Sequence, residues 1–596
     1  MAEIVLNDLN NIQKYVYGEY KSAGGSNIEW LSQLSVKFID AFKKLHEFLN
    51  RGLSKSPNKQ IIIHHCMLCA NQIVVCLRFL EKTVSTEKDQ NSCLITSRQC
   101  FFDRIFWCLV RLKSIINSAN DHVVSEQIND QANFIEILDA VLDNLASFVN
   151  LDDECNVTNK AERRANMIME SKEIFEGINN LLSLTLSFSN IAVSSDHIPL
   201  KVLSENLFKL SREFKDEFTF SNTKLNDINA VKKRLKSVEL ESSLYRLENY
   251  VNDSLLRLVY HVFSEINENP LKKLVIDAEL KSQGTEIDKF DILIERFLLI
   301  GQFAVTFAKD DVKVSSLIKS CLASIESLDT YLIPALTSKI EDPSLDILKE
   351  HFYEECDELQ RNIHLIIDTK AFCMILVDLI IDSIENNRKT FDKDSLLLIL
   401  DFSKVLLTHL TVASDNLKLH QDKVALFYFN DFKLIINECE AILTYPDPIE
   451  NFEQRVLKRY NIMKNTIKKL VSAIRVREAD FNEENLKPIV KITEAPPKNS
   501  DFFNTIRPSG YGAVLYESKR SIKSSKTQTI PQPSSAKKSA KKRNESLRRE
   551  IFKKNELKIT EDLTQNDDDI LDNTDLHITE ILDKLSSLSI HIPKKF

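Results

Sequence analysis

The sequence predicts an all-α protein built of successive antiparallel helical bundles, followed by a largely disordered C-terminal tail. The 596 residues include only 9 glycines, whereas average usage near 7% would give about 40. Glycine is the residue that tight hairpins and phosphate-binding loops require. Apolar residues recur three and four residues apart as far as about Arg477, which is the spacing of amphipathic helices. No alternating run of convincing strand length leads into a hairpin turn.

A four-helix bundle is expected over residues 1–150. Ser26 or Asn27 can cap a helix that carries apolar residues in a heptad stripe: Leu31, Leu34, Phe38, Ala41, Leu45 and Phe48. Further helices are predicted over residues 60–84, 97–119 and 134–148. Four helices with short connections favour an antiparallel bundle.

Helical patterns then continue, interrupted mainly by prolines at positions 199, 270, 343 and 446. Proline ends or kinks a helix because it lacks the N–H group and clashes with the preceding turn. We therefore expect a second bundle over residues 161–270, a third bundle region over 271–385, and a last bundle over 386–480 whose final helix is basic.

The composition changes in residues 481–596, which are rich in Pro, Ser and Lys and are predicted to be a disordered tail. Residues 519–554 hold thirteen Lys or Arg and two Glu, and the acidic stretch TEDLTQNDDDILDNTD follows them. A last apolar pattern predicts a short amphipathic segment: Leu576, Ile578, Ile581, Leu582, Leu585 and Leu588.

No pattern in the chain indicates enzyme chemistry, so we predict no enzyme, no catalytic residue, no cofactor and no metal. SGYGAV at 509–514 lacks the remaining parts of a phosphate loop. HHCMLC at 64–69 has zinc-type ligands, but no second ligand pair stands at a usual spacing, and its apolar flanks favour a buried helix. Adjacent acids such as Glu354 and Glu355 are expected at helix ends or on solvated faces.

Two basic stretches are candidate surfaces for actin or anionic lipid. The first lies on the predicted helix that ends the last bundle, opposite an apolar face: Lys458, Arg459, Lys464, Lys468, Lys469, Arg475 and Arg477. The second lies in the tail: Lys537, Lys538, Lys541, Lys542, Arg543, Arg548 and Arg549. Such clusters attract anionic membranes and also serve in nuclear import or nucleic-acid binding. A plain solvated surface is a further alternative for both.

The N-terminal sequence MAEIVLNDLN lacks the apolar core of a secretory signal, so a cytoplasmic protein is expected. Most of the eleven cysteines lie within apolar helical patterns, as reduced buried thiols do in the cytosol.

Residues 290–336 carry a more specific pattern, FDILIERFLLIGQFAVTFAKDDVKVSSLIKSCLASIESLDTYLIPAL. It resembles the vinculin and α-catenin superfamily, in which a helix ending in a VGRFA-like segment is followed by a helix with a SALASLEALxPQLVxA-like pattern. The matching residues are Ile300, Gly301, Phe303, Ala304, Ser320, Leu322, Ala323, Ser324, Ile325, Glu326, Leu328, Leu332, Ile333 and Ala335. Pro334 is expected to kink or end the second helix.

The resemblance implies a vinculin-like fold in which a central helix serves two bundles, with a stripe of small residues that lets another helix approach closely. It also implies a cytoskeletal adaptor at the inner face of the plasma membrane, with filamentous actin as a direct or indirect partner. The opening GGSNIEWLSQLSVKFIDAFKKL is similar to an insect member that acts in cellularisation of the syncytial blastoderm. The alternative is a nuclear or nucleic-acid-associated scaffold that uses the basic tail.

Overall fold

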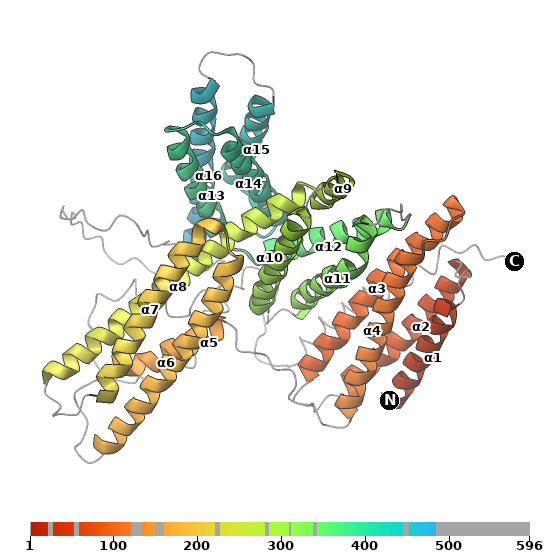
Figure 1. Cartoon of the computed structure of the whole chain (residues 1–596), viewed down its shortest axis with the longest axis horizontal. Coiled ribbons are helices and arrows are strands. Elements are labelled where there is room, and N and C mark those ends of the chain that lie inside the picture. Colours follow the sequence, from red (N-terminus) through yellow and green to blue (C-terminus); the bar gives the residue numbers. More distant parts are fainter. Residues whose placement is uncertain are drawn as a thin grey trace. The chain divides into compact units, whose positions relative to one another are not determined.

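The computed structural model describes residues 2–21, 28–52, 59–120, 134–149, 160–220, 227–280, 285–308, 312–337, 343–444 and 452–483. These residues form sixteen α-helices and no strand (Figure 1). The predicted all-α fold is therefore confirmed. The predicted tail lies outside the described residues, apart from the last turn of the final helix.

By backbone packing the described chain divides into two compact units. Unit 1 comprises residues up to 120 and 265–363, and unit 2 comprises residues 134–264 and 364–483. The helices of unit 1 are α1 (Ala2–Lys21), α2 (Ile28–Glu47), α3 (Lys59–Gln90), α4 (Ile95–Asn120), α9 (Pro270–Leu280), α10 (Thr285–Phe307), α11 (Val312–Thr337) and α12 (Leu345–Ile366). Those of unit 2 are α5 (Phe134–Val149), α6 (Lys160–Ile191), α7 (Ser194–Phe220), α8 (Asp227–Asn267), α13 (Thr369–Asn387), α14 (Lys393–Val412), α15 (Lys423–Thr444) and α16 (Phe452–Glu483).

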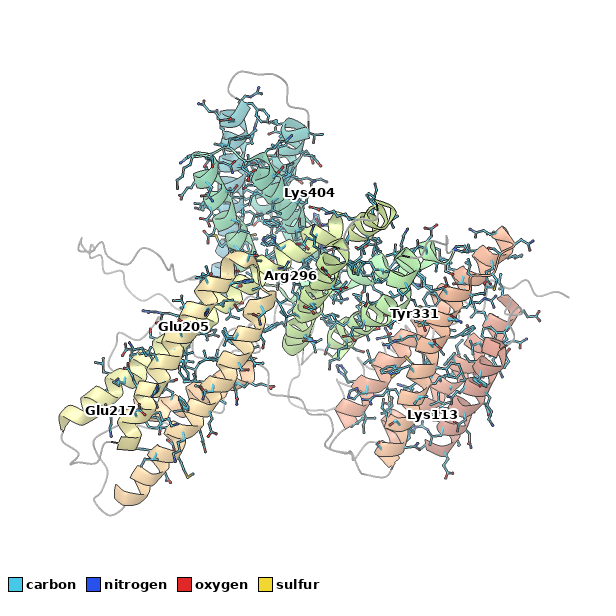
Figure 2. All side chains as sticks on the ribbon, in the orientation of Figure 1. Lys113, Glu205, Glu217, Arg296, Tyr331 and Lys404 are labelled. Atoms are coloured by element: carbon cyan, nitrogen blue, oxygen red, sulfur yellow. The ribbon has the colours of Figure 1, made fainter. Side chains whose placement is uncertain are left out.

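Unit 1 begins with a closed bundle in which α1 packs on α2 and α4, and α3 packs on the same two helices. The apolar face of α1 recurs at helical spacing and is buried: Val5, Leu9, Ile12 and Val16. Lys113 of α4 donates a hydrogen bond to Asn10 Oδ1 of α1 over 3.1 Å (Figure 2). The fourth helix of this bundle is thus α1, whereas the sequence pattern suggested residues 134–148.

The second half of unit 1 is centred on α11, which contacts α3, α4, α9 and α10. Helix α12 lies against α3, where Arg78 pairs with Glu354 and Lys82 pairs with Glu350. Asn91, directly after α3, and Asn269, between α8 and α9, take a left-handed conformation (φ 52° and 60°). Asparagine tolerates this conformation, which commonly ends helices.

Unit 2 begins with α5 to α8, in which α5 packs on α6 and α6 packs on α7. Asp196 in the first turn of α7 accepts hydrogen bonds from three side chains of α8: Tyr250 Oη at 3.0 Å, Ser254 Oγ at 2.7 Å and Arg257 Nε at 3.0 Å. The acid sits in the first turn of its helix, where a negative charge also favours the helix dipole. This buried cluster joins α7 to α8.

Helices α13 to α16 form a closed bundle in unit 2, because α13 contacts α14 and α16 while α15 contacts the same two helices. Aspartate caps begin two of them: Asp368 accepts from Ala371 N over 2.9 Å, and Asp392 accepts from Asp394 N over 3.0 Å. Lys404 of α14 reaches Glu440 of α15 over 2.9 Å (Figure 2). Inside unit 2, Tyr260 of α8 stacks on Phe372 of α13 with 4.0 Å between the ring centroids.

Two described helices are long and apolar enough, by length and composition, to cross a membrane: α3 from Ile62 to Gln90, and α14. The interior of the protein buries 72% of the apolar window of α3 and 50% of that of α14. Core helices of bundles have the same composition, so this finding is weak evidence for a span.

The predicted division into four consecutive domains and a tail stays a prediction about separate folding units. Backbone packing groups the helices differently, since residues 134–264 and 364–483 share one unit. The spacing of apolar residues predicts where helices lie in the sequence. It does not predict which distant helices pack against each other.

Candidate functional site

The helix pair α10–α11 that carries the vinculin-like pattern is closely packed at Gly301. A Cβ atom at this position would lie 2.5 Å from Cδ2 and 3.1 Å from Cγ of Leu322 on α11. Such distances are shorter than van der Waals contact, so only glycine fits without a shift of its neighbour. Close packing of α10 against α11 therefore explains why the family-like pattern has glycine at position 301.

Changing Gly301 to alanine should lower the free energy of unfolding of unit 1 by up to about 2 kcal/mol, because overpacking costs about 1–3 kcal/mol and the better helix propensity of alanine offsets about 1 kcal/mol of it. Adding Leu322→Ala should remove the clash, so the double variant should be more stable than the sum of the two single losses predicts. Denaturant melts followed by tryptophan fluorescence measure this, because both tryptophans, Trp30 and Trp107, lie in unit 1. Strictly additive losses would contradict the packing argument.

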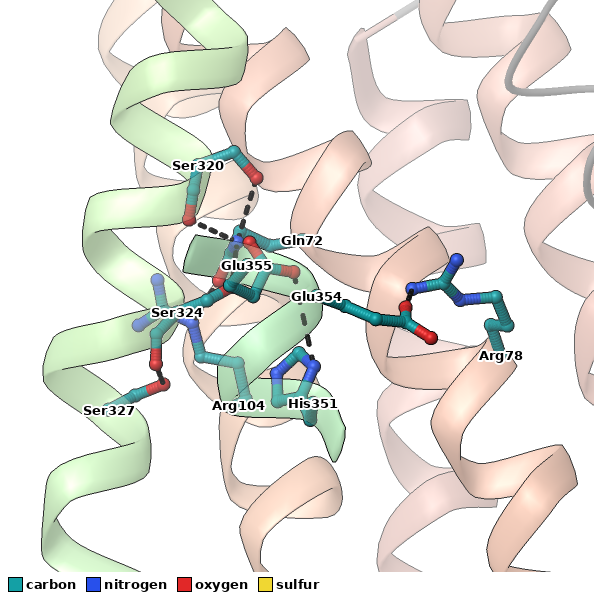
Figure 3. A network of polar contacts seen from close by, with 9 residues as sticks. All are labelled: Gln72, Arg78, Arg104, Ser320, Ser324, Ser327, His351, Glu354 and Glu355. Atoms are coloured by element: carbon teal, nitrogen blue, oxygen red, sulfur yellow. Dashed lines mark hydrogen bonds and ion pairs between the residues drawn. The ribbon is translucent and has the colours of Figure 1, made fainter. Parts of the chain in front are cut away.

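The small-residue face of α11 lies against α3 and is hydrogen-bonded to it (Figure 3). The Nε2 group of Gln72 donates to Ser320 O at 2.7 Å, Ser320 Oγ at 2.8 Å and Ser324 Oγ at 2.7 Å. Asn71 contacts Ser316 Oγ at 3.5 Å. Small side chains thus let α3 approach while their hydroxyl and carbonyl groups satisfy a buried amide.

We call this contact, together with Arg104 of α4 and with His351 and Glu355 of α12, the polar seam. Arg104 Nε of α4 donates to Gln72 Oε1 over 2.6 Å, and the guanidinium of Arg104 stacks over the Trp107 ring at 4.5 Å. Gln72 is only 1% exposed, so among the described residues its amide depends on these partners rather than on solvent. One side chain therefore connects three helices.

Helix α12 completes the polar seam with His351 and Glu355, which are 3% and 5% exposed (Figure 3). Burial, together with the positive charges of Arg78 and Arg104, lowers the pKa of His351 to about 3. Burial raises the pKa of Glu355 to about 8, against the opposing effect of a hydrogen bond from Cys321. At neutral pH the histidine is uncharged and most of the Glu355 carboxyl is protonated.

The expected place of Glu355 at a helix end or on a solvated face is thus wrong. Its neighbour Glu354 does lie at the surface, where it pairs with Arg78. Adjacent residues of a helix point about 100° apart, so one acid of a pair can face the core while the other faces water. The i, i+4 spacing of His351 and Glu355 on the apolar side of α12 was the available signal.

The structure places the family-like residues as follows. Ala304 and Leu328 are fully buried, Ser324 is buried, and Phe303 and Ala323 are half-buried. Glu326 and Pro334 are exposed. Helix α11 continues for three residues beyond Pro334 and ends at Thr337, so the predicted end falls within one turn.

The basic residues of α16 do not all face solvent. Arg459 pairs with Glu438 of α15 at 2.9 Å, and Lys464 donates to Asn461 Oδ1 at 2.9 Å. Lys458, Lys468 and Lys469 are exposed, and the last lies 5.7 Å from the Tyr428 ring. The side chains of Arg475 and Arg477 lie outside the described residues, as do all the tail candidates: Lys537, Lys538, Lys541, Lys542, Arg543, Arg548 and Arg549.

HHCMLC lies on α3, where Cys66 and Cys69 are buried and His64 is half-buried. Burial raises the pKa of the Cys66 thiol to about 12 and lowers that of His64 to about 4. Among the described residues, no group of three or more His, Cys, Asp or Glu side chains could hold a metal ion. Neutral buried thiols are typical of core packing.

Comparison with known proteins places this architecture in a family. A family model described as Serendipity locus alpha protein (SRY-A) matches residues 3–583. The Serendipity locus protein alpha of Drosophila virilis is 28% identical over 499 residues, covering 81% of this chain and 90% of that protein. The Drosophila subobscura protein of the same name is 29% identical over 469 residues, covering 76% and 82%.

A solved structure of a vinculin homologue from a sponge matches with a TM-score of 0.52 at 11% identity, covering 89% of this chain. The match covers 63% of the sponge protein, so this chain spans less than two thirds of its length. The likeness confirms the expected vinculin-like helical fold. Together with the match over nearly the whole sequence, these observations show that the chain belongs to the Serendipity locus alpha protein family.

Proposed function

We propose that this protein is a non-enzymatic cytoskeletal adaptor that organises cortical actin at the inner face of the plasma membrane. The observation that supports this most directly is the outer face of α16. Lys458, Lys468 and Lys469 are exposed on a helix whose opposite face fills the core of the α13–α16 bundle, and within the described part of the chain Lys458 and Lys468 form no ion pair. Positive charge is therefore held on a rigid surface.

Filamentous actin and anionic lipid headgroups are both acidic, and either can be attracted by such a face. The apolar side of α16 is anchored by Val456, Tyr460, Ile467 and Leu470. Tyr460 also donates a 2.6 Å hydrogen bond to Leu396 O of α14. Because the helix is fixed in this way, its lysines can meet a filament or a membrane without the bundle unfolding.

Replacing Lys458, Lys468 and Lys469 together by glutamine should weaken co-sedimentation with filamentous actin at near-physiological salt by roughly tenfold, which corresponds to about 1.4 kcal/mol. Wild-type binding should fall further as salt is raised, since exposed charges are screened. The control variant replaces Lys201 and Lys209, two exposed lysines of α7, by glutamine. It should bind like the wild type.

The same assay on a protein that ends at Glu483 separates the body from the tail. Binding by both the full chain and this truncation supports a surface in the helical body. Binding by the full chain alone assigns it to the tail residues. If neither pellets with actin, or if the triple variant binds as well as wild type, direct filament binding through α16 is wrong.

The developmental setting that fits this proposal is cellularisation of the syncytial blastoderm embryo, with the protein peripheral to the invaginating membrane. The alternative is a nuclear scaffold that uses the basic tail. A fluorescent fusion distinguishes them, because cortical enrichment is expected for the adaptor. Nuclear enrichment that disappears when residues 519–554 are deleted would overturn it.

A further inference from the structure

Helix α12 buries the carboxyl group of Glu355 in the polar seam, where no cation of the described residues forms an ion pair with it. One oxygen of Glu355 lies 3.9 Å from Nδ1 of His351, one turn earlier on the same helix. The thiol of Cys321, on α11, is hydrogen-bonded to the Glu355 carboxyl group. No Lys or Arg among the described residues forms an ion pair with Glu355.

Two arginines lie on the helices packed around Glu355, and neither forms an ion pair with it in the described part of the chain. On α3, Arg78 pairs with Glu354. On α4, Arg104 donates through Nε to Gln72 and stacks on Trp107, while its Nη2 is buried with no hydrogen-bond partner among the described residues. In this closed arrangement a carboxylate at Glu355 would therefore be buried without an ion pair.

The acids on α12 itself oppose ionisation of Glu355. Glu354 precedes it and Glu358 follows it by less than one turn, and the negative charges of both raise the pKa of Glu355. Arg78 acts in the opposite direction, but burial has the largest effect. Both the interior position and the like charges favour the protonated form.

His351 cannot supply the missing charge. Its ring lies against Phe79 of α3 at 4.3 Å and Phe101 of α4 at 5.4 Å between centroids. In the described part of the chain, no hydrogen-bond partner is within reach of its Nδ1 atom. This apolar enclosure keeps the imidazole neutral. His351 and Glu355 therefore do not form a salt bridge, and the Glu355 carboxyl group carries a proton.

We infer that closure of α12 on α3, α4 and α11 requires a proton on Glu355, so that the polar seam loosens as pH rises through the neutral range. Ionised Glu355 is stable only where water reaches it, which means with α12 displaced. Displacement would uncover Phe79 and Phe101, the apolar side chains that His351 now covers. The proton thus controls access to an apolar surface of the first bundle.

The direction of the pH effect follows from the difference between the folded and unfolded pKa values of the two residues. The pKa of Glu355 is raised from 4.5 to about 8 by folding, so its stabilising effect is complete below pH 4.5 and is lost as pH rises through 8. The pKa of His351 is lowered from 6.5 to about 3, so its effect is present above pH 6.5 and is lost as pH falls. Between pH 6.5 and 8, Glu355 is the one of these two residues whose protonation differs between the folded and unfolded states, so the seam weakens as pH rises.

Hydrogen–deuterium exchange of α12 peptides in the full chain tests this. Glu355→Gln keeps the shape and stays neutral, so the ratio of wild-type to variant exchange rates at each pH removes the intrinsic pH dependence of exchange. From pH 6.5 to 7.5 this ratio should rise by roughly tenfold, the change expected for one proton. Asp346→Asn, at an exposed acid in the first turn of the same helix, should leave the rise in place.

A second variant guards against poor folding of the first. Cys321→Ala removes the hydrogen bond that favours the ionised form of Glu355, so the rise should continue to a higher pH before it levels off. A constant ratio between pH 6 and pH 8, or a Cys321→Ala profile that levels off at a lower pH than the wild type, would overturn the inference.

Discussion

Replacing Asp196 by alanine is expected to lower the free energy of unfolding of unit 2 by about 3–5 kcal/mol, the range for breaking a buried ion pair. The substitution leaves the guanidinium of Arg257, which is 19% exposed, without its carboxylate. It also leaves the hydroxyl groups of Ser254 and Tyr250 without their acceptor. Each buried donor that loses its partner adds a desolvation penalty.

Denaturant unfolding followed by far-ultraviolet circular dichroism measures the loss. Tryptophan fluorescence is an internal control because both tryptophans lie in unit 1. Glu205→Ala, at an exposed site of the same helix, should stay within about 0.5 kcal/mol of wild type. A loss below 1 kcal/mol for Asp196→Ala would mean that the cluster does not hold α7 to α8.

Replacing Gln72 by leucine should lower the free energy of unfolding of unit 1 by about 2–4 kcal/mol. The change keeps the approximate volume but removes the amide that serves Ser320, Ser324 and Arg104 together. Unsatisfied buried polar groups contribute about 1–3 kcal/mol each, and neighbouring losses do not simply add. Tryptophan fluorescence in a denaturant series reports this unit.

A compensating variant tests the cause. Gln72→Leu combined with Ser320→Ala and Ser324→Ala removes the amide together with the two hydroxyl groups that it served, which can be nearly neutral for those groups. Arg104 Nε and the carbonyl oxygen of Ser320 still lack their partner, so only part of the lost stability should return. If the triple variant is less stable than Gln72→Leu alone, the loss arises from packing rather than from unpaired polar groups.

Much of the local structure could be predicted from sequence because helix formation depends on residues within a few positions of each other. The expected helices at 60–84, 97–119 and 134–148 correspond to α3, α4 and α5. The helix that starts after GGSN corresponds to α2, Ile28–Glu47. Helix α1 was not singled out, although the buried residues Val5, Leu9, Ile12 and Val16 have helical spacing.

The candidate site was predictable only in part. The two-faced pattern of α11 indicated a second helix close to its small residues, and that neighbour is α3. Its identity could not be read from the pattern, because Gln72 and Ser320 are 248 positions apart. The lysines of α16 were visible in the sequence, but the pairing of Arg459 with Glu438 was not.

The sequence by itself determined that the chain is helical, where α2, α3, α4 and α5 lie, and that α11 has two packing faces. The spacing of apolar residues, the capping residues and the scarcity of glycine all act over a few neighbouring positions, so they can be recognised in the sequence. Only the tertiary structure decided that α1 closes the first bundle, that Gln72 joins α3 to α11, and that Glu355 is buried while Glu354 is not. These outcomes depend on which distant surfaces exclude water together, and that choice is made by the whole folded chain.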